Sequence, residues 1–175
     1  MAGSPAHKFG QDLGNLLEDL VLNFILKPRL LAYVKDKNLY LDSQGTRPAR
    51  GGAKHVAWKD GFGNSHNLDF VIELGGTTQN IGRPVAFIEA AWRRYTKHSK
   101  NKAQEIQGAL LPIVQLHHAP FCGVVLAGEF TGPSIDQLES NGFCVLYVPY
   151  ASVIAAFRET LILLRCRSMN LSDGV

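Results

Sequence analysis

Residues 84–94 read PVAFIEAAWRR, an apolar stretch that contains one carboxylate and ends in two arginines. The residues before Glu89 are apolar on both faces of an extended chain, which predicts a buried strand. A carboxylate in such a strand costs free energy unless a cation or hydrogen-bond donors accompany it. Glu89 therefore requires a functional explanation.

The segments around this strand show the periodicities of further strands and helices. Residues 67–74, NLDFVIEL, alternate with a period of two and place their apolar residues on one face (Leu68, Phe70, Ile72 and Leu74). Pro28 is expected to end or bend the first helix and Pro112 a later one. Strands are predicted at residues 55–60, 67–74, 84–92, 121–129 and 143–150, and helices at residues 11–27, 29–38, 99–111, 134–142 and 151–165.

This order predicts an α/β fold with three layers, in which helices flank a mixed central sheet of about five strands. The first three strands are expected to form an antiparallel meander, and crossover helices bring in the last two. The 175 residues suit a single domain. Residues 42–53, rich in Gly, Ser, Thr, Pro and Arg, are expected to form a mobile loop, and residues 167–175 a flexible tail.

The composition excludes several classes of protein. The three cysteines, Cys122, Cys144 and Cys166, lie in apolar runs without a close pair, which argues against a disulfide framework or a structural zinc site. The N-terminus lacks the apolar core of a signal peptide, and no apolar run is long enough to span a membrane. We expect a cytoplasmic protein without a membrane partner.

Basic residues concentrate in two stretches that contain no acid. Residues 47–54 form one, and residues 92–102 form the other with five full positive charges (Arg93, Arg94, Lys97, Lys100 and Lys102). Such local patches favour a polyanionic partner although the formal net charge is only +3. The alternative is an ordinary solvated surface.

Asp69 and Glu89 are the best candidates for a metal site. They lie on predicted neighbouring strands joined by a short turn, so their side chains can meet in one pocket. Paired carboxylates suit Mg²⁺, and the Ala90 carbonyl could provide a further oxygen ligand. The alternative is that the two acids only mark the ends of strands.

Lys102 is anomalous in the helix predicted from Ser99. With Ser99 as N-cap, Lys100 and Lys102 lie in the first turn, where cations oppose the helix dipole. Lys102 precedes Ile106 by four residues, so it is directed toward the sheet. A bound phosphate would explain this placement, whereas a lysine that lies along the sheet and extends to water would need no ligand.

The order Asp69, a short turn, then FIEAAW resembles the PD-(D/E)XK nuclease superfamily, over about residues 10–150. The resemblance implies a restriction-endonuclease-like fold, an Asp and a Glu that bind Mg²⁺, and a lysine two residues after the Glu that orients the attacking water. Leu68 stands where the motif has proline. Ala91 stands where the motif has lysine, so that role passes to Lys102 first and Lys97 second. Otherwise Ala91 marks an engineered change or a catalytically inactive member.

The first helix also resembles members in which an acid from that helix joins the metal site, and here the matching acid is Glu18. A solvent-exposed glutamate is the alternative.

The sequence therefore predicts a Mg²⁺-dependent endonuclease that cleaves double-stranded DNA, with Mn²⁺ able to substitute. Within the family a type II-like restriction endonuclease acting as a homodimer, or its catalytic domain, is the first choice, and a Holliday-junction resolvase or repair nuclease is the second. A DNA-binding or assembly module without catalysis is the alternative from another class. The expected phosphate contacts are Arg93, Arg94 and Lys100, and the expected groove contacts are Arg47, Arg50 and Lys54.

Overall fold

The computed structural model describes residues 14, 16, 19, 21–93, 95–119 and 121–155. The other residues include Glu18, Arg94, Cys166, most of the last predicted helix and the predicted tail, so those expectations lie outside the described part. In chain order the elements are η1 (Val21–Leu26), α2 (Lys27–Asp36), β1 (Tyr40–Ser43), η2 (Pro48–Arg50), β2 (Val56–Lys59), β3 (Ser65–Leu68), β4 (Phe70–Leu74), β5 (Arg83–Arg93), η3 (Thr96–His98), α3 (Ser99–His117), β6 (Phe121–Gly128), α4 (Gly132–Ser140) and β7 (Cys144–Pro149).

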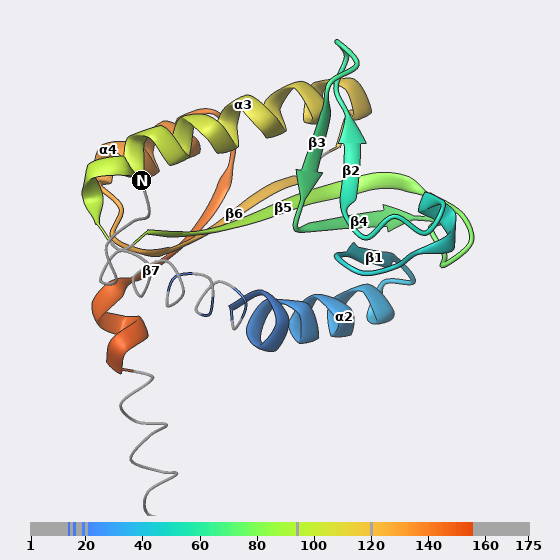
Figure 1. Cartoon of the computed structure of the whole chain (residues 1–175), viewed down its shortest axis with the longest axis horizontal. Helices are drawn as coiled ribbons and strands as arrows, with labels where there is room; N and C mark the ends of the chain where they lie inside the picture. The colour runs from blue at the N-terminus through green and yellow to red at the C-terminus, as the bar shows by residue number, and fades with distance from the viewer. Residues whose placement is uncertain are drawn as a thin grey trace, which may run out of the picture.

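The architecture is a five-stranded mixed sheet flanked by helices, an α/β fold with three layers as predicted (Figure 1). The strand order is β1-β4-β5-β6-β7. β4 is antiparallel to β1 and β5, while β5, β6 and β7 run parallel. α3 and α4 connect the parallel strands and cover one face, and α2 lies on the other face. Parallel neighbours need such crossovers, because a tight turn cannot join them.

The core lies on both faces of the sheet, and β5 contributes to each. Phe87 and Ala91 belong to the larger cluster with α3, whereas Ala86 and Ile88 belong to the cluster with Val34 of α2. This alternation follows from the period of two in a strand. The inner face predicted for α3 is buried (Ala103, Ile106, Leu110 and Ile113).

The predicted strand over residues 67–74 is two strands in two sheets. β3 pairs with β2 in a separate hairpin, and β4 pairs with β1 and β5. The chain bends at Asp69 between them, and Leu68 packs in the α3 cluster while Phe70 packs in the α2 cluster. The antiparallel pairings predicted between consecutive strands are present, but they lie in two sheets. The prediction of one continuous meander and of a shared apolar face is therefore wrong.

Neither of the two prolines ends the helical segment in which it lies. Pro28 lies at the start of α2, where its missing amide hydrogen leaves no helical bond unmade, and the chain is helical on both sides of it. Pro112 lies inside α3, which continues to His117.

The segment predicted as a mobile loop is held by a buried ion cluster. The Arg47 guanidinium donates to both carboxylate oxygens of Glu73, at 2.7 and 2.9 Å, and lies 2.8 Å from Asp42 Oδ2. It also donates to the carbonyls of Thr77 and Asn80. Arg47 is 3% exposed and Glu73 0%, so one arginine joins β1, β4 and the turn before β5.

The same cluster corrects the expectation that Arg47 and Arg50 contact nucleic acid. Arg47 is buried in its contacts with Glu73 and Asp42. Arg50 donates to the Gly45 and Ser43 carbonyls and forms an ion pair with Asp42 at 3.3 Å, with 7% of its side chain exposed. The composition suggested a basic loop, but carboxylates occupy both guanidinium groups, and one of them, Glu73, is 26 residues from Arg47.

Replacing Arg47 tests the importance of this cluster. We expect Arg47→Met to lower the free energy of unfolding by about 3–5 kcal/mol, because Asp42 and Glu73 would remain buried without their cation. Urea unfolding followed by circular dichroism measures the loss. Arg83→Met, at an exposed position, is the matched control and should change stability by about 0.5 kcal/mol or less. Equal stabilities for the two variants would contradict a structural role for Arg47.

Candidate active site

Asp69 lies where the chain leaves the β2–β3 hairpin and enters the main sheet. Leu68, on one side, pairs with Val56 in the hairpin, and Phe70, on the other, pairs with Ile88 of β5. The pairing of β4 with β5 therefore begins at Phe70, opposite Ile88. No β4 residue lies opposite the Ala90 amide. The Asp69 Oδ2 atom accepts a hydrogen bond from that amide at 2.9 Å. The side chain of Asp69 thus replaces the missing strand partner.

Glu89 comes from the same unpaired end of the β4–β5 ladder. It lies between Phe87 and Ala91 on β5, both of which pack toward α3, so the period of two directs Glu89 to that side. Its Oε1 atom is buried and has no hydrogen-bond partner. An orphaned carboxylate oxygen beside a second acid is what a cation site requires.

The two carboxyl groups influence each other strongly. Burial raises the pKa of Glu89 to about 9, and the charge of Asp69 adds to the increase. Burial also raises the pKa of Asp69, against the opposing effects of the Ala90 amide, of Glu89 and of the Lys102 charge. Two neighbouring buried acids titrate as a pair, and at neutral pH this pair retains a proton in the absence of a cation.

Lys102 is the lysine that the structure relates to this pair. Its charge lowers the pKa of both Asp69 and Glu89. Its side chain is 28% exposed, and its Nζ atom lies 3.4 Å from Glu105 Oε2. Lys97 lies in η3 with an exposed side chain. The assignment of the motif lysine's role to Lys102 first and to Lys97 second stays a prediction.

The N-terminal end of α3 differs in detail from the prediction. Ser99 is helical and does not cap the helix. Its hydroxyl instead contacts those of Ser134 and Thr131, at 3.0 and 3.3 Å, which joins the starts of α3 and α4.

Ala91 is buried between the sheet and α3, where the resemblance implies a lysine. It is 3% exposed and belongs to the cluster that contains Phe87 and Ala103. Cys122, on the neighbouring strand, is also buried, and burial together with the Glu89 charge raises the pKa of its thiol to about 12. The thiol is therefore protonated and is a poor nucleophile.

The residues present fit a hard divalent cation. Asp69 and Glu89 can provide carboxylate oxygens, and Mg²⁺ commonly binds through one or two carboxylates and completes its shell with water and substrate oxygens. Among the described residues no group of three or more His, Cys, Asp or Glu side chains could hold a metal ion. The carbonyl of Ala90 as a further ligand stays a prediction.

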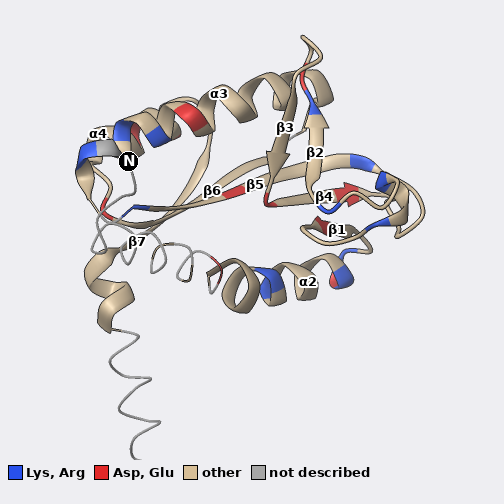
Figure 2. Cartoon of the chain, in the orientation of Figure 1, with Lys and Arg blue, Asp and Glu red and all other residues tan. Residues whose placement is uncertain are grey.

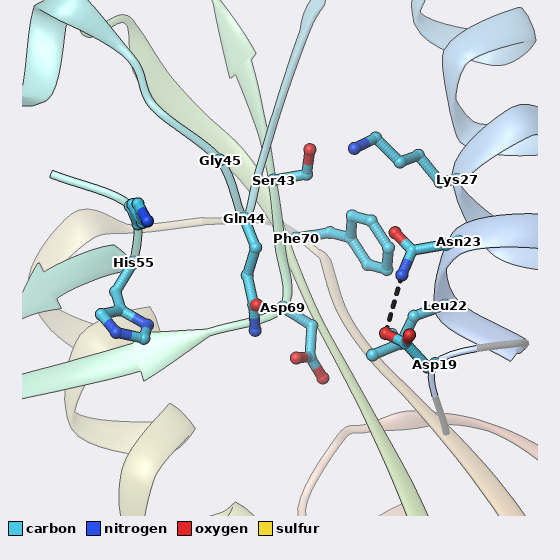
Figure 3. Close-up of a pocket in the computed structure, with 11 residues that line it drawn as sticks. Asp19, Leu22, Asn23, Lys27, Ser43, Gln44, Gly45, His55, Asp69 and Phe70 are labelled. Carbon is cyan, nitrogen blue, oxygen red and sulfur yellow. Dashed lines mark hydrogen bonds between the residues drawn. The ribbon is translucent and has the colours of Figure 1, made fainter. Parts of the chain in front are cut away.

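A cavity of about 710 Å³ lies beside Asp69, which forms part of its wall, and Glu89 does not line it. Figure 3 shows Asp69 between the first helical segment on one side and His55 on the other. Four stretches of chain contribute the lining: Asp19, Leu22, Asn23 and Lys27; Ser43, Gln44 and Gly45; Lys54 and His55; Asp69 and Phe70.

Most of these cavity residues were not predicted from the sequence. Glu18 was the expected acid of the first helix. In the described part of that segment the acid that lines the cavity is Asp19, which accepts a hydrogen bond from Asn23 at 2.9 Å. Lys54 was predicted to contact nucleic acid and does line the cavity. Lys27 and His55 belong to no motif in the sequence. Lys27 is a basic residue at the end of a predicted helix, and His55 is the first residue of a predicted strand.

Two other basic residues predicted to contact phosphate, Arg93 and Lys100, lie near the start of α3. Figure 2 shows Lys and Arg gathered there. Lys100 is exposed. Arg93 donates to the Trp92 carbonyl at 3.0 Å and lies 3.9 Å from Glu105, with 32% of its side chain exposed. Both can reach a polyanion beside Lys102.

Comparisons with known proteins identify no family. No family model matches the chain, and no curated protein matches it. A solved structure titled "Crystal Structure of Protein of Unknown Function AF1548" is similar, with 10% sequence identity and a TM-score of 0.44. The similarity covers 68% of this chain and 54% of that one, so this chain spans about half of its length. No helix in the described residues is long and apolar enough to cross a membrane.

Neutralising Glu89 should stabilise the protein without metal. A carboxyl whose pKa is raised on folding favours the folded state below the unfolded pKa, near 4.5, and this contribution is lost as pH rises toward about 9. At about pH 8 in EDTA, we therefore expect Glu89→Gln to raise the free energy of unfolding by about 1–3 kcal/mol. Adding Mg²⁺ should raise the melting temperature of the wild type and have little effect on the variant.

The control is Glu139→Gln, an exposed glutamate on α4. It should change neither the pH dependence of stability nor the response to Mg²⁺. A Glu89→Gln variant that is less stable than the wild type throughout this pH range would contradict the paired-acid interpretation.

Proposed function

We propose that the protein is a Mg²⁺-dependent endonuclease that hydrolyses DNA phosphodiester bonds. The observation that carries the proposal is the buried pair Asp69 and Glu89, in which one carboxylate oxygen lacks a partner and Asp69 also lines an open cavity. A structural pair would have its oxygens satisfied by donors, as Glu73 has.

Asp69 and Glu89 would hold the metal, with the Ala90 carbonyl as an expected further ligand and Mn²⁺ as an expected substitute. When bound, a divalent ion supplies charge that polarises a phosphoryl oxygen and lowers the pKa of a water molecule. Lys102 would orient the attacking water or stabilise negative charge in the transition state, and Lys97 is the second candidate. Arg93 and Lys100 would bind neighbouring phosphates.

The resemblance to PD-(D/E)XK nucleases supports the same function. The two acids of the motif correspond to Asp69 and Glu89, which the fold brings together. Ala91 stands in place of the motif lysine, and Lys102 would supply the positive charge instead. Double-stranded DNA as substrate, a homodimer as the active form and restriction rather than junction or repair cleavage remain predictions from the sequence.

A second candidate function is a DNA-binding or assembly module that does not cleave. The observation that favours it is Ala91, which packs into the core where an active member of the family would carry lysine. Such a module would bind DNA without metal and leave it intact.

Plasmid cleavage separates the two functions. With Mg²⁺ or Mn²⁺, we expect the wild type to nick or linearise supercoiled DNA. Asp69→Asn or Asp69→Ala should reduce the rate by roughly 100-fold or more, because the metal loses a charged ligand. Gel electrophoresis over time gives the rates. Binding by the wild type without any cleavage, under either metal, would exclude the nuclease and support the module.

The lysine assignment is tested by three matched variants, Lys102→Gln, Lys97→Gln and Lys100→Gln. We expect Lys102→Gln to lower kcat by about 10- to 100-fold with little change in KM. Lys100→Gln should raise KM and leave kcat unchanged, since it loses only a phosphate contact. If Lys97→Gln lowers kcat and Lys102→Gln does not, the two roles are exchanged.

A further inference from the structure

The cavity beside Asp69 has the size of a binding site for one small ligand. Its volume of about 710 Å³ lies within the usual range for such sites, about 300–1,000 Å³. The cavity is open to the surface and is large enough to hold one nucleotide. Enzymes that place a base in a pocket of this size first take that base out of the duplex stack. A single nucleotide is the unit of DNA that fits.

The lining provides the groups that a nucleotide needs. Lys27 and Lys54 contribute amines, and neither is ion-paired with a described carboxylate. In Figure 3 the Lys27 amine extends toward Ser43. Asn23 and Gln44 contribute amides that can donate to and accept from the edge of a base, and Asp19 contributes a further acceptor. The amines can therefore bind phosphate oxygens, and the amides can bind the edge of a base.

The wall formed by residues 43–55 is fixed before any ligand binds. The Gly45 amide donates to the Lys54 carbonyl at 2.9 Å, and the Arg50 guanidinium donates to the Gly45 carbonyl at 2.7 Å. Arg50 is itself held by Asp42. Groups that are already in place lose little entropy on binding, which favours a specific site over a flexible basic surface.

Asp69 connects this cavity to the proposed metal site, since it lines the cavity and contacts the Ala90 amide beside Glu89. We propose that the cavity binds one unpaired nucleotide of the DNA strand, next to the phosphodiester bond that is cleaved. Lys27 binds its phosphate, and Asn23 and Gln44 bind its base. The assignment rests on the proposed nuclease function and specifies its substrate class as DNA that contains an unpaired or extruded nucleotide.

Binding in EDTA tests the site independently of cleavage. Two fluorescently labelled duplexes are compared by anisotropy, one fully paired and one identical except for a single unpaired nucleotide. We expect the wild type to bind the second about tenfold more tightly. Lys27→Gln and Gln44→Leu should each bring the ratio of the two dissociation constants close to one. Lys100→Gln, outside the cavity, should weaken both complexes equally and preserve the ratio.

The outcomes separate this proposal from the proposed function. A wild-type ratio near one, no binding to either duplex, or a ratio that Lys27→Gln and Gln44→Leu leave unchanged overturns the nucleotide site. Unchanged melting temperatures of the variants show that a lost preference does not reflect unfolding. A preference without any metal-dependent cleavage would retain the site and reject the nuclease. Cleavage without a preference would retain the nuclease and reject the site.

Discussion

The hydrogen bond from the Ala90 amide to the Asp69 carboxylate is the interaction on which the candidate site depends. It exists because β4 stops pairing with β5 at Phe70, where the chain turns out of the hairpin. An antiparallel strand that continued straight would have satisfied Ala90 with a backbone carbonyl and left no acid there. The branching of the sheet therefore creates the opening, places Asp69 in it and brings Asp69 beside Glu89.

This arrangement lowers the stability of the folded protein at Glu89. Glu89 occupies a strand position whose neighbours on the same face, Phe87 and Ala91, are apolar and buried. An apolar residue at Glu89 would pack more favourably than a carboxyl that keeps its proton at neutral pH. Natural proteins retain such locally unfavourable groups mainly where function needs them.

The sequence was sufficient to predict the regular part of the fold, because its central strands and α3 have clear periodicities. It was insufficient where the determinants are distant in sequence. β1 has only four residues and precedes a segment rich in Gly and Pro, so no periodicity marks it. The ion pair of Arg47 spans 26 residues. The alternation through Leu68 and Phe70 gave no sign of the bend, because an acid between two apolar residues suits a single strand equally well.

Sequence separation also explains why the two acids of the site were predicted and the walls of the cavity were not. Asp69 and Glu89 were predicted to be neighbours because one turn joins their strands, and the structure brings them together. The cavity walls come from four stretches of chain that only the tertiary fold assembles, so Lys27 and Gln44 could not be associated with Asp69 beforehand.

The arginine cluster also bears on the behaviour of the protein in concentrated solution. β1 is the last strand on its side of the described sheet, and it is short and carries an acid, Asp42, that points inward to two guanidinium groups. Short edge strands with inward-pointing charges resist the addition of foreign strands. The contacts that fix the loop thus also protect this border against self-association into extended sheets.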